Sequence, residues 1–171
     1  MNSIDRPMRP LGTISFRGRL KYAFLFDRFA ITVQDYMLHV PEGDERGPRV
    51  EVQRLEEHAT GSEAAIIPTS LGAPIWRGDF FRFVPGTRGN WERAHYHPIF
   101  EGLEPCERAW LPELEADPIA WVAQELSENL RSIFTMGNAE DLLDEDSLAD
   151  VQAAVPAITE AMRLCLTEAR G

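Results

Sequence analysis

The spacing of the apolar residues changes once along this chain of 171 residues, close to Gly102. Before that point, short alternating or aromatic runs are separated by turn-forming glycine, proline and aspartate, which is the pattern of β-strands. Beyond it, apolar residues recur at intervals of three and four, which is the pattern of amphipathic helices. We therefore predict an α+β fold: an antiparallel sheet, strongly twisted or barrel-like, over about residues 11–100, followed by C-terminal helices.

The length and composition fit a single domain covering residues 1–171, with a β-rich part, 11–102, and an acidic helical part, 103–171. The chain has no run of about 20 apolar residues, and its N-terminus lacks the pattern of a signal peptide. We therefore expect a soluble, cytoplasmic protein that does not contact a membrane. Its two cysteines, Cys106 and Cys165, lack metal-type spacing and are expected to be reduced thiols.

Runs of aromatic and β-branched residues predict the strands, which we place at 13–16, 22–26, 29–33, 36–40, 50–55, 64–67, 75–84 and 91–100. Glycine and proline predict a loop over 41–48 and a break over 70–74. The turn-forming residues 85–90 would let strand 91–100 return antiparallel to strand 75–84.

The best-defined helix is predicted to begin at Asp117 and Pro118. Aspartate caps free amides at the start of a helix, and proline is tolerated at the first helical position. An apolar face continues to Phe134, and Gly137 fits the C-terminal cap.

A second apolar stripe runs from Leu148 to Cys165, after an acidic segment, 138–147, that is predicted to form one short helical turn. Pro156 lies inside the stripe and should kink or split the helix, because its ring clashes with the preceding turn. The stripe suits a helix that packs within its own chain, or a seam between two copies of the chain.

The negative charge of the protein lies in its last third. Residues 1–100 carry 13 basic and 12 acidic side chains, whereas residues 101–171 carry 4 and 16. Such a surface repels nucleic acid phosphates and anionic lipid, so nucleic acid is not expected as a partner. A basic protein or a second copy of the chain would suit these acidic helices. A non-catalytic interaction or homodimerisation module is therefore one hypothesis for the function.

The stretch from Gly89 to Gly102 holds two of the four histidines, and it is where we would look first for a chemical site. His95 and His97 are two apart, so on a strand their imidazoles project from the same face, together with Arg93. Glu101 follows four residues later, and two imidazoles with one carboxylate are a common ligand set for a divalent transition metal. We therefore predict a metal site formed by His95, His97 and Glu101.

Asp79 lies on the partner strand of the predicted hairpin and is a candidate fourth ligand or a partner of a ligand. A shift of one residue in the pairing would move it to the other face of the sheet. The sequence does not determine this register.

The spacing G-x5-H-x-H-x3-E resembles the first half of the first metal-binding motif of the cupins, with Gly89, His95, His97 and Glu101 at its four positions. The resemblance covers about a dozen residues and implies a β-barrel with the two histidines and the glutamate on a metal ion. The chain departs from the cupin pattern at Arg108, where the motif has its closing glycine. No histidine follows His97, so the second cupin motif is absent.

A metal-free enzyme would use the same residues differently. His95 or His97 would act as general acid or base, with Asp79 close by and Arg93 or Arg77 binding an anion, as in small hydrolases and ribonucleases. In a further alternative, the two histidines have no chemical role and form ordinary hydrogen bonds on a strand. The sequence does not decide whether the protein is an enzyme.

Overall fold

The computed structural model describes residues 15–40, 43–58, 61–62, 68–84 and 94–167. Its main sheet is antiparallel and has the strand order β1-β2-β3-β4-β6, with β5 pairing to β3 beyond the end of β4. The strands are β1 (Ser15–Leu25), β2 (Phe29–Val40), β3 (Gly43–Glu57), β4 (Thr69–Asp79), β5 (Arg82–Val84) and β6 (His95–His97). A small separate hairpin, β7 (Phe100–Glu101) and β8 (Glu104–Pro105), follows β6.

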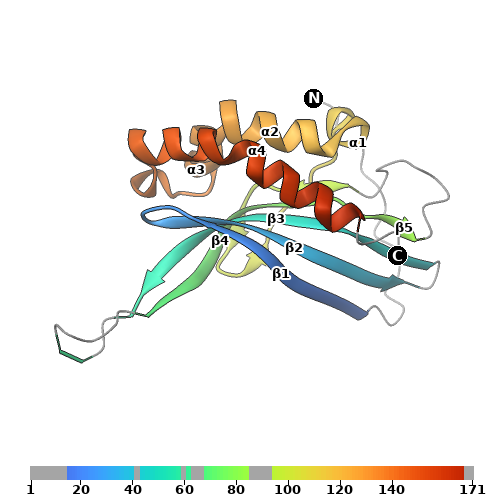
Figure 1. Ribbon diagram of the computed structural model, residues 1–171, viewed down its shortest axis with the longest axis horizontal. Coiled ribbons are helices and arrows are strands. Elements are labelled where there is room, and N and C mark those ends of the chain that lie inside the picture. Colours follow the sequence, from blue (N-terminus) through green and yellow to red (C-terminus); the bar gives the residue numbers. More distant parts are fainter. Residues whose placement is uncertain (1–14, 41–42, 59–60, 63–67, 85–93, 168–171) are drawn as a thin grey trace.

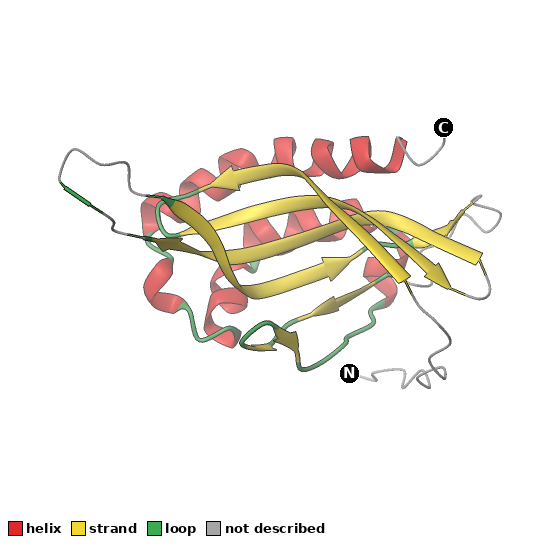
Figure 2. Ribbon diagram, turned by 90° about the horizontal axis from the view of Figure 1, so that it is seen from below, coloured by secondary structure: helices red, strands yellow, loops and turns green. Residues whose placement is uncertain are grey.

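The helices follow the sheet in the chain and cover one of its faces (Figure 1). They are α1 (Pro112–Ala116), α2 (Pro118–Glu128), α3 (Leu130–Met136), the short 3-10 helix η1 (Glu140–Leu142) and α4 (Glu145–Thr167). The opposite face of the sheet is turned toward the viewer in Figure 2, with the helices behind it. The predicted α+β class, an antiparallel sheet followed by C-terminal helices, is therefore confirmed. Across the described strands the sheet is open, with β1 and β6 at its edges, and it does not close into a barrel.

The hydrophobic core lies between the sheet and the helices. Trp76 of β4 is fully buried and stacks on Trp121 of α2 with ring centroids 5.9 Å apart. Phe29 of β2 meets Phe134 of α3 edge to face at 4.8 Å. Because side chains alternate along a strand, the residues between the core positions point to the face that the helices leave uncovered.

The predicted loop over 41–48 is wrong for residues 43–48, because β3 begins at Gly43 and runs through Gly47 and Pro48, while residues 41–42 lie outside the described ranges. The amide of Phe80 donates to the carbonyl of Pro48 at 3.0 Å, and a β-carbon on Gly47 would lie 1.9 Å from the Phe80 carbonyl oxygen. The glycine therefore permits a close backbone approach inside the sheet, although in the sequence it resembles a turn residue.

The predicted break over 70–74 is also wrong, since these residues belong to β4. Irregular pairing with β3 around Gln53 accommodates Pro74 in this stretch. The predicted strand over 75–84 is divided at Phe80 and Phe81 into the end of β4 and the short β5. The predicted strand at 64–67 lies outside the described residues.

The helix predicted to begin at Asp117 and Pro118 is confirmed at both ends. The Asp117 side chain accepts hydrogen bonds from the amides of Ile119 and Ala120 at 3.1 and 3.0 Å, and Gly137 is the C-cap of α3. The expected single helix is divided at Asn129 into α2 and α3. The expected turn in the acidic segment is the 3-10 helix η1.

Helix α4 is not split at Pro156 but continues to Thr167. Pro156 and Gln152, four residues earlier, are both exposed, so water can satisfy the carbonyl that proline leaves without an amide donor.

The apolar stripe of helix α4 is buried within the chain, with Val155 8% and Ile158 0% exposed. Association with a second copy or with a basic partner remains a prediction. No helix in the described ranges has both the length and the apolar character that crossing a membrane requires.

Candidate metal centre

The pairing of β4 with β6 brings together three candidate site residues that the sequence indicated, Asp79, His95 and His97. Asp79 lies directly opposite His95, and Arg77 lies opposite His97. Between them, Tyr96 packs its ring against Trp76 and Trp121 of the core. Because side chains alternate, Asp79, His95 and His97 all project from the face of the sheet opposite the helices, which Figure 2 shows toward the viewer.

Asp79, His95 and His97 are each nearly inaccessible, with exposed fractions of 2%, 7% and 4%. The Nε2 atoms of His95 and His97 both lie 3.4 Å from Oδ2 of Asp79. One ligand atom from each of the three side chains lies within 4.8 Å of the other two, and this is the group in the described residues that could hold a metal ion.

A distance of 3.4 Å is long for a hydrogen bond between an imidazole and a carboxylate, which lies at about 2.7–3.2 Å. Two ligand atoms that each lie about 2.1 Å from a tetrahedral ion are about 3.4 Å apart. The separation of each imidazole nitrogen from the carboxylate oxygen is therefore compatible with a shared ion.

The ring of His97 is oriented by a backbone carbonyl. Its Nδ1 lies 2.6 Å from the carbonyl oxygen of Glu107, and because a carbonyl only accepts, Nδ1 carries the proton. Nε2, the other nitrogen of the ring, faces Asp79. Metal-binding histidines typically have this arrangement, with the second nitrogen donating to a carbonyl or carboxylate. His95 packs beside Trp110, with ring centroids 4.8 Å apart.

Arg49 of β3 fixes the orientation of the Asp79 carboxylate. Its Nε donates to Oδ1 at 2.6 Å, and its guanidinium stacks 3.8 Å over the ring of Tyr36. Oδ2, the other oxygen of the carboxylate, is the one that faces the two histidines. Burial alone would raise the pKa of Asp79, but the interactions with His95, His97 and Arg49 outweigh it and hold this pKa well below its usual value.

A second ion pair lies beside this group on the same face. Arg77 Nη1 is 3.5 Å from Oε1 of Glu51, and Gln34 Nε2 donates to Oε2 of Glu51 at 2.7 Å. Burial raises the pKa of Glu51, although Arg49 and Arg77 counteract part of this effect. The sheet face therefore carries a connected set of buried polar groups from four strands, β2, β3, β4 and β6.

The predicted ligand Glu101 is exposed in β7 and is not part of the group, in which the carboxylate comes from Asp79. Arg93 and Gly89 lie outside the described residues. Sequence reasoning missed Arg49 and Glu51. In the sequence, Arg49 and Glu51 alternate with Val50 and Val52 of β3. Any strand with one face in water shows the same alternation, so the pattern does not identify them as site residues.

In comparisons with protein-family models, curated proteins and solved structures, the chain has no significant match. The resemblance to the cupins therefore rests on residue spacing alone. The open sheet and the exposed Glu101 differ from the closed barrel and the ligand set that the resemblance implies.

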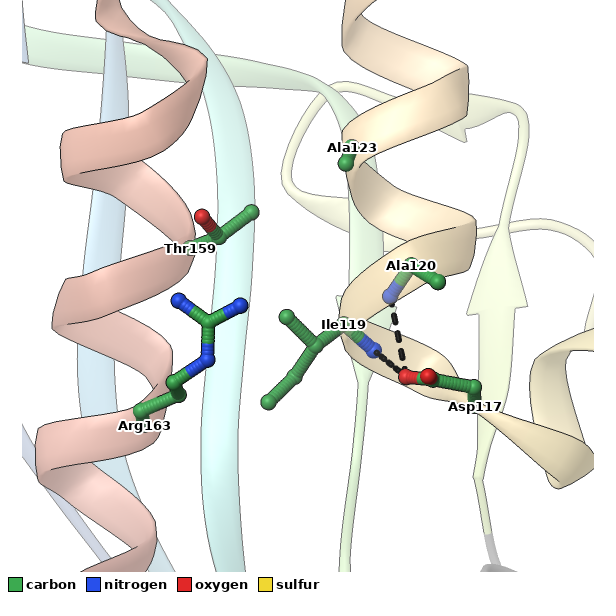
Figure 3. A pocket seen from close by; sticks show the side chains of 6 residues that line it. All are labelled: Asp117, Ile119, Ala120, Ala123, Thr159 and Arg163. Carbon is green, nitrogen blue, oxygen red and sulfur yellow. Dashed lines mark hydrogen bonds between the residues drawn. The ribbon is translucent and has the colours of Figure 1, made fainter.

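A separate cleft of about 210 Å³ lies between α2 and α4 and is lined by Asp117, Ile119, Ala120, Ala123, Thr159 and Arg163 (Figure 3). Its carboxylate, Asp117, caps α2, and Arg163 pairs with Glu160 at 3.4 Å. The charged groups of this cleft thus have structural partners, and it lacks the converging histidines of the sheet face.

Proposed function

We propose that this protein binds a divalent transition metal ion through Asp79, His95 and His97. The observation that carries the proposal is the convergence of two imidazole nitrogens on one buried carboxylate oxygen, each at 3.4 Å. Two histidines and one carboxylate bind zinc in hydrolytic enzymes and iron(II) in oxygenases, and they leave coordination positions open for water or substrate.

The surroundings support the same proposal. Glu107 orients His97 through its backbone carbonyl, and Arg49 occupies the carboxylate oxygen that faces away from the histidines. Such partners hold ligands in place before the ion arrives, so less ordering is needed on binding.

Elemental analysis of the purified protein, with any affinity tag removed, tests the proposal. We expect near-stoichiometric zinc, iron, manganese, nickel or copper in the wild type and none in a His95→Ala/His97→Ala variant. The matched control is His39→Ala/His58→Ala, because His39 forms its hydrogen bond with Asp44 and His58 forms its hydrogen bond with Ser70. The control variant should retain the metal. If wild type and both variants all lack metal after reconstitution with excess zinc and iron(II), the proposal is wrong.

A metal-free acid–base role for the histidines is the second candidate. It is supported by the carboxylate of Asp79 beside both rings, since a buried aspartate that orients an imidazole is a common feature of general-base catalysis. It predicts hydrolysis of phosphodiester or ester substrates that survives exhaustive chelation. Activity that is lost with the metal would exclude it.

A further inference from the structure

The charges around Asp79 balance without a metal ion. Two guanidinium groups, Arg49 and Arg77, face two carboxylates, Asp79 and Glu51, and these side chains are only 3–14% exposed. The two guanidinium groups equal the two carboxylates in number, so the group has no surplus carboxylate to balance a further cation. A divalent ion would add two positive charges in a largely buried place. Because an uncompensated buried charge is strongly unfavourable, the filled site should attract anions.

Arg77 is the cation best placed to meet such an anion. It lies directly opposite His97 in the strand pairing, and its guanidinium lies 5.2 Å from the ring centroid of Phe100. Its contacts with Asp79 Oδ2 and Glu51 Oε1 are both 3.5 Å, too long for good hydrogen bonds. Its Nε is buried and, within the described part of the chain, has no hydrogen-bond acceptor. The planar guanidinium of Arg77 thus lies next to the proposed metal ligands with a hydrogen-bond donor unused.

We propose that the metal ion at Asp79, His95 and His97 takes a small oxyanion as a further ligand, and that Arg77 binds the same anion. This inference rests on the proposed metal site. One oxygen of the anion coordinates the ion, and another accepts hydrogen bonds from the guanidinium. The chemistry fits a phosphate or a carboxylate group, because both present oxygens at the spacing of a guanidinium fork. The substrate or cofactor of the site would accordingly carry such a group.

Titration of the metal-free protein with Co²⁺, followed by its visible absorption, tests both parts. The titration is run in a zwitterionic buffer alone, with inorganic phosphate and with acetate. We expect Co²⁺ to bind in all three, with the apparent affinity on the order of tenfold higher when an oxyanion is present, and with a changed spectrum. By the same linkage, calorimetry should show that phosphate and acetate bind the Co²⁺ form but not the metal-free form.

The outcomes separate the two proposals. If Co²⁺ does not bind, the metal site itself is wrong. If Co²⁺ binds with the same affinity and spectrum in all three buffers, or if the anions bind equally well to the metal-free protein, only the oxyanion inference is wrong. An effect of phosphate alone assigns a phosphoryl group, and an effect of acetate alone assigns a carboxylate.

Variants of Arg77 test its part. Arg77→Lys keeps the charge beside Glu51 but loses the planar fork, and Arg77→Gln/Glu51→Gln removes the ion pair without changing the net charge. Both variants should bind Co²⁺ in plain buffer. The ratio of their Co²⁺ affinities with and without an oxyanion should fall toward one. The control is Arg54→Gln, because Arg54 donates to the Asn138 carbonyl at 2.9 Å and lies outside the group. If the Arg77 variants keep the enhancement of the control, Arg77 does not bind the anion.

Discussion

Asp79 and His95 lie directly opposite each other where β4 pairs with β6, and this register places the carboxylate and the imidazole on the same face of the sheet. His97, two residues further on, joins them because side chains alternate along a strand. A shift of one residue would separate the acid from both bases. The site therefore depends on the backbone pairing as much as on the identity of its three side chains.

We predict that Asp79→Asn destabilises the metal-free protein strongly. It would leave the guanidinium of Arg49, 14% exposed, without its charged partner at 2.6 Å. Removing one member of a buried ion pair costs about 3–5 kcal/mol of unfolding free energy. Urea unfolding in the presence of a chelator measures this loss.

A double-mutant cycle provides the control for this pair. The variant Arg49→Gln/Asp79→Asn removes both charges, so its loss should be clearly smaller than the sum of the two single losses. Additive losses would show that the two side chains do not stabilise the fold as a pair.

We predict that Gly47→Ala is also strongly destabilising. Its β-carbon would lie 1.9 Å from the carbonyl oxygen of Phe80, a backbone atom that cannot move without disturbing the sheet. Forcing extra atoms into such a place costs about 1–3 kcal/mol. The matched control is Gly72→Ala, whose β-carbon would meet only the side chain of Glu56, which is exposed and can move away. Equal stability of the two variants would contradict the close approach at Gly47.

The fold class and the helix ends could be predicted from the sequence because their causes are local. Asp117, Pro118 and Gly137 act within one turn of chain, and a change in apolar period needs only neighbouring residues. The predictions for Gly47 and Pro48 were wrong because these residues lie where the backbone at Phe80 approaches β3 closely, which no local pattern shows. The prediction for Pro74 was wrong because this residue lies at an irregularity in the pairing of β4 with β3.

The candidate site was predictable only in part. Two histidines two residues apart on a strand share a face whatever their surroundings, so their proximity follows from sequence. The carboxylate that meets them is 16 residues earlier in the chain, at Asp79, and its place depends on a register that no local pattern encodes. Glu101 was nearer in sequence, but it lies exposed in the small hairpin.

We predict that Asp117→Ala costs about 1 kcal/mol, the usual loss for removing a helix N-cap. The Asp117 carboxylate accepts from the amides of Ile119 and Ala120, as the dashed lines in Figure 3 show. Asp117→Ser keeps an acceptor at the same place and should recover most of the loss. Thermal unfolding of the two variants beside the wild type measures the difference. A serine variant as unstable as the alanine variant would show that the cap is not the cause.

We finally predict that Glu125→Gln stabilises the protein at neutral pH. Burial raises the pKa of Glu125, and the hydrogen bond from Asn129 at 2.8 Å offsets this only in part. The folded protein thus holds the proton on this carboxyl more tightly than the unfolded chain does. Stability from this group is present below the unfolded pKa, about 4.3, and is lost as the pH rises through the raised folded value.

Glutamine stays neutral throughout and avoids that loss. The two proteins should therefore have similar unfolding free energies near about pH 3, with the variant gaining under about 1 kcal/mol by about pH 7, because the side chain is only half-buried. Urea unfolding across this range measures the difference, and Glu128→Gln on the same helix controls for removing one negative charge from an acidic protein. A Glu125→Gln protein that loses stability relative to wild type as the pH rises would contradict the prediction.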